Sequence, residues 1–173
     1  MGRMLVVMSG LPGSGKSTIA DALGQELGAP VLSVDPIEAA IWRCGIAPSF
    51  ETGVAAYEVA AVVAEHQLSL GLTAIVDSVS SAEVARDMWR RAARRAGAQL
   101  RVIEVVCSDE HSHRQRLAGR LRAIEGFPEP SWDEVQQRRA EWEPWTDDRL
   151  VIDTRRTLDE NLEDALWFLG RRG

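Results

Sequence analysis

The sequence predicts an α/β fold in which helices cover both faces of a parallel β-sheet. Short apolar runs of strand length alternate along the chain with longer segments of helical periodicity, and this alternation is typical of parallel sheets. The first apolar run leads into a glycine-rich turn and then into a helix. The chain has 173 residues, of which 45% are apolar, so residues 1–173 are expected to form a single domain with a substantial core.

In the first half of the chain, continuous apolar runs predict buried strands and periodic apolar residues predict helices. The helix after the first strand carries Ile19, Leu23 and Leu27 at helical spacing and ends at Gly28. Glycine, proline and serine predict a loop over residues 45–53. The expected strands are residues 4–9, 31–34 and 73–76, and the expected helices are residues 17–27, 37–43 and 54–70.

In the second half of the chain, capping signals mark the helices. Ser81 begins and Gly97 ends an amphipathic helix, and Ser131 with Glu134 forms a capping box. The segment over residues 121–145 is the part least needed for the core, so we expect it to form a helical lid. The expected strands are residues 100–107 and 150–152, and the expected helices are residues 81–96, 109–124, 131–142 and 159–169.

The turn after the first strand, GLPGSGKS, matches the phosphate-binding pattern G-x-x-x-x-G-K-[ST] in full. The glycines allow backbone N–H groups and the helix N-terminus to point at a phosphate. Lys16 is the only lysine among 20 basic residues, and it stands where a compact point charge must fit a tight loop. The alternative is a glycine-rich turn without a ligand. The expected nucleotide-binding residues here are Gly10, Leu11, Pro12, Gly13, Ser14, Gly15, Lys16, Ser17 and Thr18.

Two aspartates follow apolar strands, where ligands of parallel sheets bind. Asp77 could hold Mg²⁺ through water while the Ser17 hydroxyl ligates it directly, or it could cap a turn. Asp35 could accept a proton from a substrate hydroxyl, or it could be the N-cap of the helix that follows. The residue types alone favour neither reading of Asp35. Trp42 and Ser78, with Asp35 and Asp77, are the expected substrate-binding residues.

A basic helix is expected beside the lid. Arg116 and Arg120 lie four residues apart and share one helix face. Because the chain is acidic overall, arginines gathered near a phosphate site favour a binding role over a solvated face. Lys16, Asp35, Arg120 and Arg138 are the expected catalytic residues, and the arginines would stabilise the transferring phosphoryl group. Further basic residues near the lid are His113, Arg114, Arg122 and Arg139.

The composition disfavours several classes of protein. The net charge of −6 argues against broad nucleic-acid binding, and the arginines over residues 86–95 are expected to form a solvated helix face. The apolar runs are too short for a membrane span and no signal peptide is recognised, so a cytoplasmic location is expected.

The cysteines and histidines suggest neither a redox site nor a metal site. Cys44 and Cys107 are expected to be reduced structural thiols. The three histidines lack the spacing of a zinc site.

The arrangement resembles the P-loop kinases of the nucleoside-monophosphate-kinase-like group. It is nearest to small phosphotransferases such as chloramphenicol phosphotransferase, gluconate kinase, zeta toxins and the kinase domain of polynucleotide kinase. The matching stretches are GLPGSGKS, the SVDPIEA that contains Asp35, and the RLAGR that joins Arg116 to Arg120. No acceptor-binding motif of the known kinases is evident over residues 36–70. The lid stretches GFPEPSW and EWEPW do not form a metal-binding lid.

The resemblance implies a three-layer P-loop NTPase fold with sheet order 2-3-1-4-5. It also implies that Asp35 is the general base, that Arg116 packs on adenine and that Arg120 contacts phosphates. The turn after the last strand, Asp153-Thr154-Arg155, would lie beside the adenine. ATP and Mg²⁺ would be the donor and its metal.

We therefore expect an ATP-dependent kinase that acts on a hydroxyl of a small molecule, such as an antibiotic, a nucleoside or a sugar-like acceptor. One alternative is a nucleotide-dependent switch or regulatory ATPase that binds a protein partner. The guanine-reading Asn-Lys-x-Asp pattern of GTPases is absent from the sequence. A polynucleotide 5′-kinase is a third reading, supported only by the arginines over residues 86–95. The sequence predicts no particular oligomeric state.

Overall fold

The computed structural model describes residues 2–119, 124 and 126–170, and a five-stranded sheet lies at its centre. All neighbouring strands are parallel, in the order β2-β3-β1-β4-β5. This is the predicted order, so the fold class is confirmed. The strands are β1 (Met4–Ser9), β2 (Val31–Ser33), β3 (Ala74–Asp77), β4 (Gln99–Val106) and β5 (Arg149–Asp153).

The central strand β1 is buried along its whole length because helices cover both faces of the sheet. Its side chains alternate between two separate cores. Leu5 and Val7 join the core beneath α3 (Phe50–Ser69) and α4 (Glu83–Arg95), whereas Val6 and Met8 join the core beneath α1 (Lys16–Leu27) and α7 (Leu158–Phe168). This is why the strand reads as a continuous apolar run rather than an alternating one.

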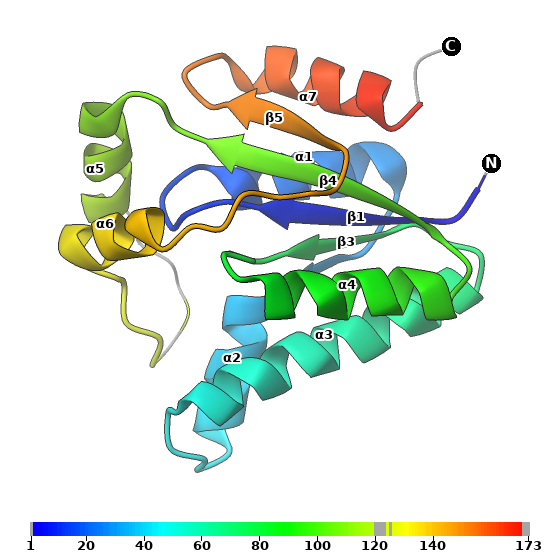
Figure 1. Ribbon diagram of the computed structural model, residues 1–173, viewed down its shortest axis with the longest axis horizontal. Helices are drawn as coiled ribbons and strands as arrows, with labels where there is room; N and C mark the ends of the chain where they lie inside the picture. The colour runs from blue at the N-terminus through cyan, green and yellow to red at the C-terminus, as the bar shows by residue number, and fades with distance from the viewer. Residues whose placement is uncertain (1, 120–123, 125, 171–173) are drawn as a thin grey trace.

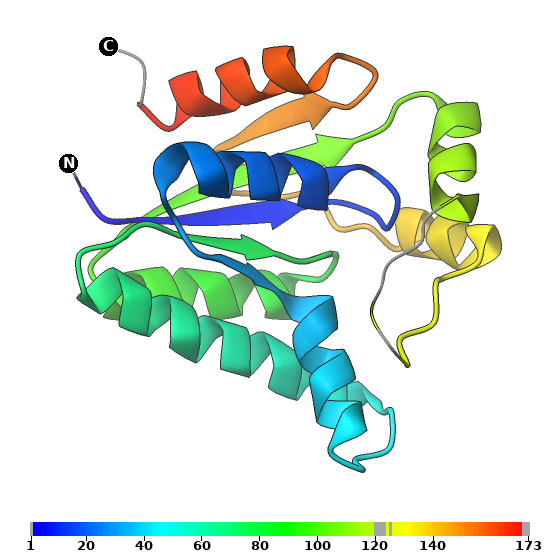
Figure 2. The ribbon, with the colours of Figure 1, turned by 180° about the vertical axis from the view of Figure 1, so that it is seen from behind.

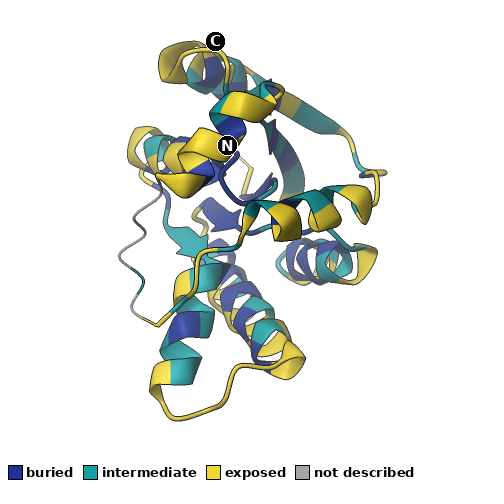
Figure 3. Ribbon diagram, turned by 90° about the vertical axis from the view of Figure 1, so that its left-hand side faces the viewer, coloured by how far each residue is buried: buried dark blue, intermediate teal, exposed yellow. Residues whose placement is uncertain are grey.

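The three layers are visible from opposite sides in Figure 1 and Figure 2, with the sheet between the α1–α7 layer and the α3–α4 layer. The remaining helices, α2 (Val34–Arg43), α5 (Glu110–Ala118) and α6 (Trp132–Ala140), lie toward the carboxyl ends of the strands (Figure 1). The inner strands β1 and β3 are buried along their whole length, whereas the edge strands β2 and β5 are partly exposed, as are the outer sides of the helices (Figure 3). None of the described helices is both long and apolar enough to cross a bilayer.

Several element boundaries differ from the prediction: α4 begins at Glu83, with Ala82 rather than Ser81 as its N-cap, and α5 ends at Ala118 rather than at residue 124. Two helix starts also differ by three residues or more. α2 begins at Val34 rather than at residue 37, so the expected second strand is one residue shorter. α3 begins at Phe50, so residues 50–53 of the expected loop are helical. Ser49 explains the second difference: its side chain accepts from the Thr52 N–H, and the Thr52 side chain accepts from the Ser49 N–H. This capping box stabilises a helix start despite the nearby glycine.

The register of the sheet brings several side chains to one edge. Met8 of β1 lies opposite Asp77 of β3, and Asp77 lies opposite Ser33 of β2. The loop after β1, the end of β3 and the start of α2 therefore share the carboxyl edge, where ligands of open parallel sheets bind.

Candidate active site

The loop between β1 and α1 is shaped by glycines that no other residue could replace without strain. Gly13 and Gly15 have φ values of 80° and 95°, in the left-handed region that favours glycine. A Cβ on Gly10 would lie 2.3 Å from the carbonyl oxygen of Val105 in β4. The loop therefore packs closely against the end of β4. The conformation that the glycines allow lets its backbone N–H groups point toward a ligand.

Two polar side chains of this loop are almost fully enclosed. Lys16, the first residue of α1, is only 4% exposed, and Ser14 is 1% exposed. The Ser14 hydroxyl has no hydrogen-bond partner among the described residues. Buried polar groups are normally paired, so an orphaned hydroxyl in a phosphate-type loop fits a site that is completed by an anion.

One side of the loop opens into two neighbouring cavities of about 220 Å³ each. Arg116 of α5 lines both of them. The first cavity is lined by Gly13, Gly15, Lys16, Ser17, Thr18 and Arg116. The second is lined by Gly15, Thr18, Ile19, Arg116, Thr154, Arg156, Leu158 and Asn161. The predicted donor half of the site thus forms a continuous region from the loop to the start of α7.

Thr154, which follows β5, ties this region together. The Arg116 guanidinium donates to the Thr154 hydroxyl at 2.6 Å and to its carbonyl oxygen at 2.9 Å. The same hydroxyl lies 2.8 Å from the carbonyl oxygen of Ser14 in the loop. Arg155, the residue expected from the resemblance, is exposed and lines neither cavity, whereas Arg156 lines one. Arg120 and Arg122 lie outside the described residues.

Asp77 at the end of β3 is buried, with 6% exposure. Its Oδ2 accepts from the Ser33 hydroxyl at 3.2 Å, whereas its Oδ1 has no hydrogen-bond partner among the described residues. A buried carboxylate oxygen in this position beside the phosphate loop is suited to bind Mg²⁺ through a water molecule. Ser78 instead points into the interior, where its hydroxyl lies 2.6 Å from that of Ser80. Ser78 was expected to bind substrate, but it does not line the cavity that Asp35 and Trp42 share.

A larger cavity of about 420 Å³ lies on the other side of the loop, and Pro12 forms part of its wall. Asp35 and Trp42 of α2 line it from one side, and Arg138 of α6 lines it from another. Asp35 is neither at a strand end nor an N-cap, because Ser33 is the N-cap and Asp35 is the second residue of α2. The structure nevertheless brings Asp35, Trp42 and Arg138 to one space beside the phosphate loop.

The wall formed by α2 and α3 is held by a chain of hydrogen bonds. The Trp42 indole N–H donates to the Thr52 hydroxyl at 3.0 Å, and that hydroxyl lies 3.1 Å from Glu38 Oε1. Phe127 stacks on Trp42, with ring centroids 4.9 Å apart. Burial raises the pKa of Glu38, and the nearby Asp35 carboxylate adds to the increase, against the opposing effects of Thr52 and Arg138.

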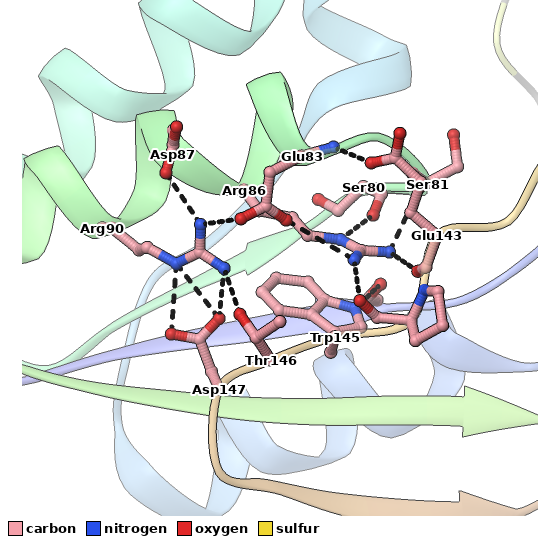
Figure 4. Close-up of polar contacts among 12 residues, drawn as sticks. Ser80, Ser81, Glu83, Arg86, Asp87, Arg90, Glu143, Trp145, Thr146 and Asp147 are labelled. Carbon is pink, nitrogen blue, oxygen red and sulfur yellow. Dashed lines mark hydrogen bonds and ion pairs between the residues drawn. The ribbon is translucent and has the colours of Figure 1, made fainter.

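The segment after α6 is anchored to the body of the protein by Arg86 (Figure 4). Arg86 is fully buried, and its guanidinium donates to the carbonyl oxygens of Ser80, Ser81, Glu143 and Pro144. It also lies over the Trp145 ring, at 4.5 Å from the centroid. The expectation of a solvated face over residues 86–95 is therefore wrong for Arg86, because the helix packs this side chain against carbonyls from a distant segment.

Two further contacts strengthen this anchor. Arg90 pairs with Asp147 at 2.6 Å, and the buried Trp145 donates its indole N–H to Ser9 at 3.1 Å. Trp145 belongs to one of the two cores. The expected lid over residues 121–145 thus includes residues that the core holds in place.

His113 of α5 links the lid helix to the phosphate loop. Its Nε2 lies 2.8 Å from the Pro12 carbonyl oxygen, and the Arg139 guanidinium lies 3.1 Å from its Nδ1. These partners suit a neutral ring that donates at Nε2 and accepts at Nδ1. Burial lowers the pKa of His113, and the charges of Arg139 and Arg116 lower it further, against the opposing Pro12 carbonyl and Glu110.

A family model described as an AAA domain matches residues 5–142 of this chain. The chain belongs to this family. No match was found among curated proteins.

Solved structures with the same fold cover nearly the whole chain of this AAA domain. An unliganded sugar kinase from Janibacter sp. HTCC2649 is 21% identical, with a TM-score of 0.73 over 99% of this chain and 96% of that one. The Mycobacterium tuberculosis APS kinase CysC in complex with AMPPNP and APS is 20% identical, with a TM-score of 0.69 over 98% of each chain. A gluconokinase from Sinorhizobium meliloti 1021 is 19% identical, with a TM-score of 0.66 over 98% of this chain and 92% of that one. The predicted resemblance to P-loop kinases is confirmed in family and fold.

Two residues of the site, Glu38 and Phe127, were not found from the sequence. Thr154 lies in the turn that the resemblance placed beside the adenine, but its contacts with Ser14 and Arg116 were not predicted, because they depend on three elements that meet only in the folded chain. Glu38 could have been found, because it lies three residues after Asp35 on the same helix and so faces the same side. Phe127 lies in a turn whose position relative to α2 the sequence does not indicate.

Proposed function

We propose that this protein transfers the γ-phosphoryl group of ATP to a hydroxyl of a small molecule. The observation that carries the proposal is that cavities with different linings open beside the phosphate loop. Two cavities lined by Arg116, one of them also by Lys16, open at Gly15, and the cavity lined by Asp35 opens at Pro12 of the same loop. A loop that only hydrolysed nucleotide would need no such second cavity.

On the donor side, the loop N–H groups and Lys16 would hold the β- and γ-phosphates. Arg116, already fixed by Thr154, would cover the base or the phosphates from α5. Ser17 and, through water, Asp77 would hold Mg²⁺, which neutralises charge on the phosphates when it is bound. The uncompensated Oδ1 of Asp77 supports this assignment.

On the acceptor side, Asp35 would orient the acceptor hydroxyl and take its proton. The hydroxyl oxygen then forms a bond to the γ-phosphorus while the bond from that phosphorus to the β-bridging oxygen breaks, and ADP leaves. Lys16 and Arg138 would balance the charge on the transferring group, and Arg120 remains a candidate for the same role. Closure of α6 over the cavity would exclude water.

The kinases of the same fold support this reading over the alternatives. APS kinase CysC was solved with both AMPPNP and APS, a nucleotide analogue and a small acceptor. The polynucleotide 5′-kinase hypothesis is weakened, because two of the arginines over residues 86–95 on which it rests are engaged within the protein: Arg86 is buried and Arg90 is paired with Asp147. The regulatory ATPase reading leaves the acceptor cavity without a purpose.

The test is ADP release from ATP and Mg²⁺ across a panel of sugars, nucleosides, amino alcohols and antibiotics, with mass spectrometry of the products. Lys16→Ala should abolish transfer while the fold survives. Asp35→Asn should lower kcat by about 100- to 10,000-fold, the usual contribution of a general base, whereas Asp148→Asn, at an exposed position outside the cavities, should not. Transfer that persists in Lys16→Ala, or a panel without any phosphorylated product, would contradict the proposed function.

A further inference from the structure

Carboxylates outnumber guanidinium groups among the described residues that line the acceptor cavity. Among the described residues that line it, the carboxylates are Asp35, Glu38, Glu129 and Glu134, and the only guanidinium is that of Arg138. Glu134 lies one helical turn before Arg138 on α6 and interacts with its charge. A carboxylate, sulfate or phosphate of an acceptor placed beside Glu38 would be repelled, because like charges brought together in a partly buried space repel.

Two of these carboxylates belong to the same helix face. Asp35 and Glu38 stand three residues apart on α2, and both line the cavity, which places their Cβ atoms about 5–6 Å apart. Their mutual repulsion and the burial of Glu38 together disfavour the charged form of Glu38. A positively charged group bound between Glu38 and the solvent would remove this cost, whereas a neutral group would leave it in place.

An aromatic wall adjoins the two carboxylates. Trp42 is one turn beyond Glu38 on α2 and is held by Thr52 on one side and by the stacked Phe127 on the other. A ring fixed in this way offers an apolar surface at low entropic cost, and its π-face also attracts cations. The cavity therefore has an apolar surface, the Trp42 ring, next to the carboxylates of Asp35 and Glu38.

We infer that the acceptor is an amino alcohol, in which a hydroxyl reaches Asp35, a neighbouring ammonium group pairs with Glu38, and the carbon skeleton lies against Trp42. This inference rests on the proposed function, since it assigns the hydroxyl that Asp35 activates. The separation of the two carboxylates suits a hydroxyl and an ammonium group on adjacent or next-adjacent carbons, as in amino sugars and aminocyclitols. Glu38 is then the specificity-determining residue of the site.

The test compares matched sugars that differ in charge at one position. The probes are glucosamine, which carries an ammonium group, N-acetylglucosamine and glucose, which are neutral, and glucuronate, which is anionic. We expect kcat/KM for phosphorylation to be highest for glucosamine and lowest for glucuronate. Isothermal titration of the wild-type protein with each sugar, without ATP, should give the same order, and this arm needs no catalysis.

The variant Glu38→Gln keeps an oxygen that can accept from Thr52 but removes the charge. It should reduce the ratio of kcat/KM for glucosamine to that for glucose by about 10- to 100-fold, the loss that follows from removing a charge-assisted hydrogen bond. The change should appear in KM more than in kcat, because Glu38 contacts no reacting atom. Glu58→Gln, at an exposed position on α3 outside the cavity, is the matched control and should keep the wild-type ratio.

The failure of this inference can be told apart from the failure of the proposed function. If glucose or glucuronate is phosphorylated as well as glucosamine in a Lys16-dependent reaction, the inference is wrong and the kinase reading stands. If the ratio is the same in Glu38→Gln as in the wild type, Glu38 does not read the charge. If glucosamine is neither bound nor phosphorylated, the inference is also wrong, and the proposed function is judged by the wider panel.

Discussion

The anchor made by Arg86 predicts a large loss of stability when its guanidinium is removed. In Arg86→Met, a side chain of similar length keeps the contact with Trp145 but donates no hydrogen bond. The carbonyl oxygen of Ser80, bonded within the interior, would lose its donor at a cost of about 1–3 kcal/mol. The carbonyls of Ser81, Glu143 and Pro144 are only part-buried, so water can replace Arg86 there and the cost is about 0.5–1.5 kcal/mol each.

We therefore expect the free energy of unfolding to fall by about 3–5 kcal/mol, after allowance for the guanidinium that no longer has to be desolvated. Urea denaturation with linear extrapolation measures this change. Arg91→Met, at an exposed position of the same helix, removes the same charge and should change stability by less than about 0.5 kcal/mol. If Arg86→Met lay within about 1 kcal/mol of Arg91→Met, the carbonyl cluster would not be what holds this segment.

Two further predictions concern the phosphate loop and its support. The pKa of His113 is lowered in the folded state, chiefly by burial, so its contribution to stability is complete above the ordinary value of about 6.5 and is lost as pH falls from there through the lowered pKa. The urea concentration at the unfolding midpoint should decrease as the pH is lowered from 7.5 to 5. His113→Gln should remove most of this pH dependence, and an equal pH dependence in both proteins would refute the assignment. Gly10→Ala would place a Cβ 2.3 Å from the Val105 carbonyl oxygen and should raise KM for ATP about 5- to 150-fold, from a strain of about 1–3 kcal/mol. Gly2→Ala, which has no neighbour within 4 Å, is its control, and an unchanged KM in Gly10→Ala would contradict the tight fit.

The donor half of the site could be predicted from the sequence because its chemistry is local. The loop, the strand before it and the helix after it occupy consecutive residues, and β1 reads as one apolar run because both of its faces are buried. Lys16 and Ser17 follow directly from the motif. The spacing on a single helix indicated only that Arg116 and Arg120 share a face, and the role of Arg116 was a prediction from the resemblance; its partner Thr154 comes from a distant part of the chain.

The acceptor half could not be predicted to the same depth because its wall is assembled from distant segments. Pro12, Asp35, Tyr57, Phe127 and Arg138 meet only in the folded chain. The error over Arg86 has the same origin. A run of charged residues on a helix is usually solvated. Nothing in the residues next to Arg86 indicates that its guanidinium donates to the carbonyl oxygens of Glu143 and Pro144.

The phosphate loop lies next to cavities that are built from different elements, and this division has an evolutionary consequence. The cavities on the donor side are built from α1, α5 and the start of α7, whereas the acceptor cavity is built largely from α2, α3 and the segment that contains α6. Under the proposed function, substitutions at Glu38 or Trp42 would change which acceptor binds and leave the residues that hold the phosphates unaltered. A protein with this division could acquire new acceptors through substitutions in the acceptor half alone.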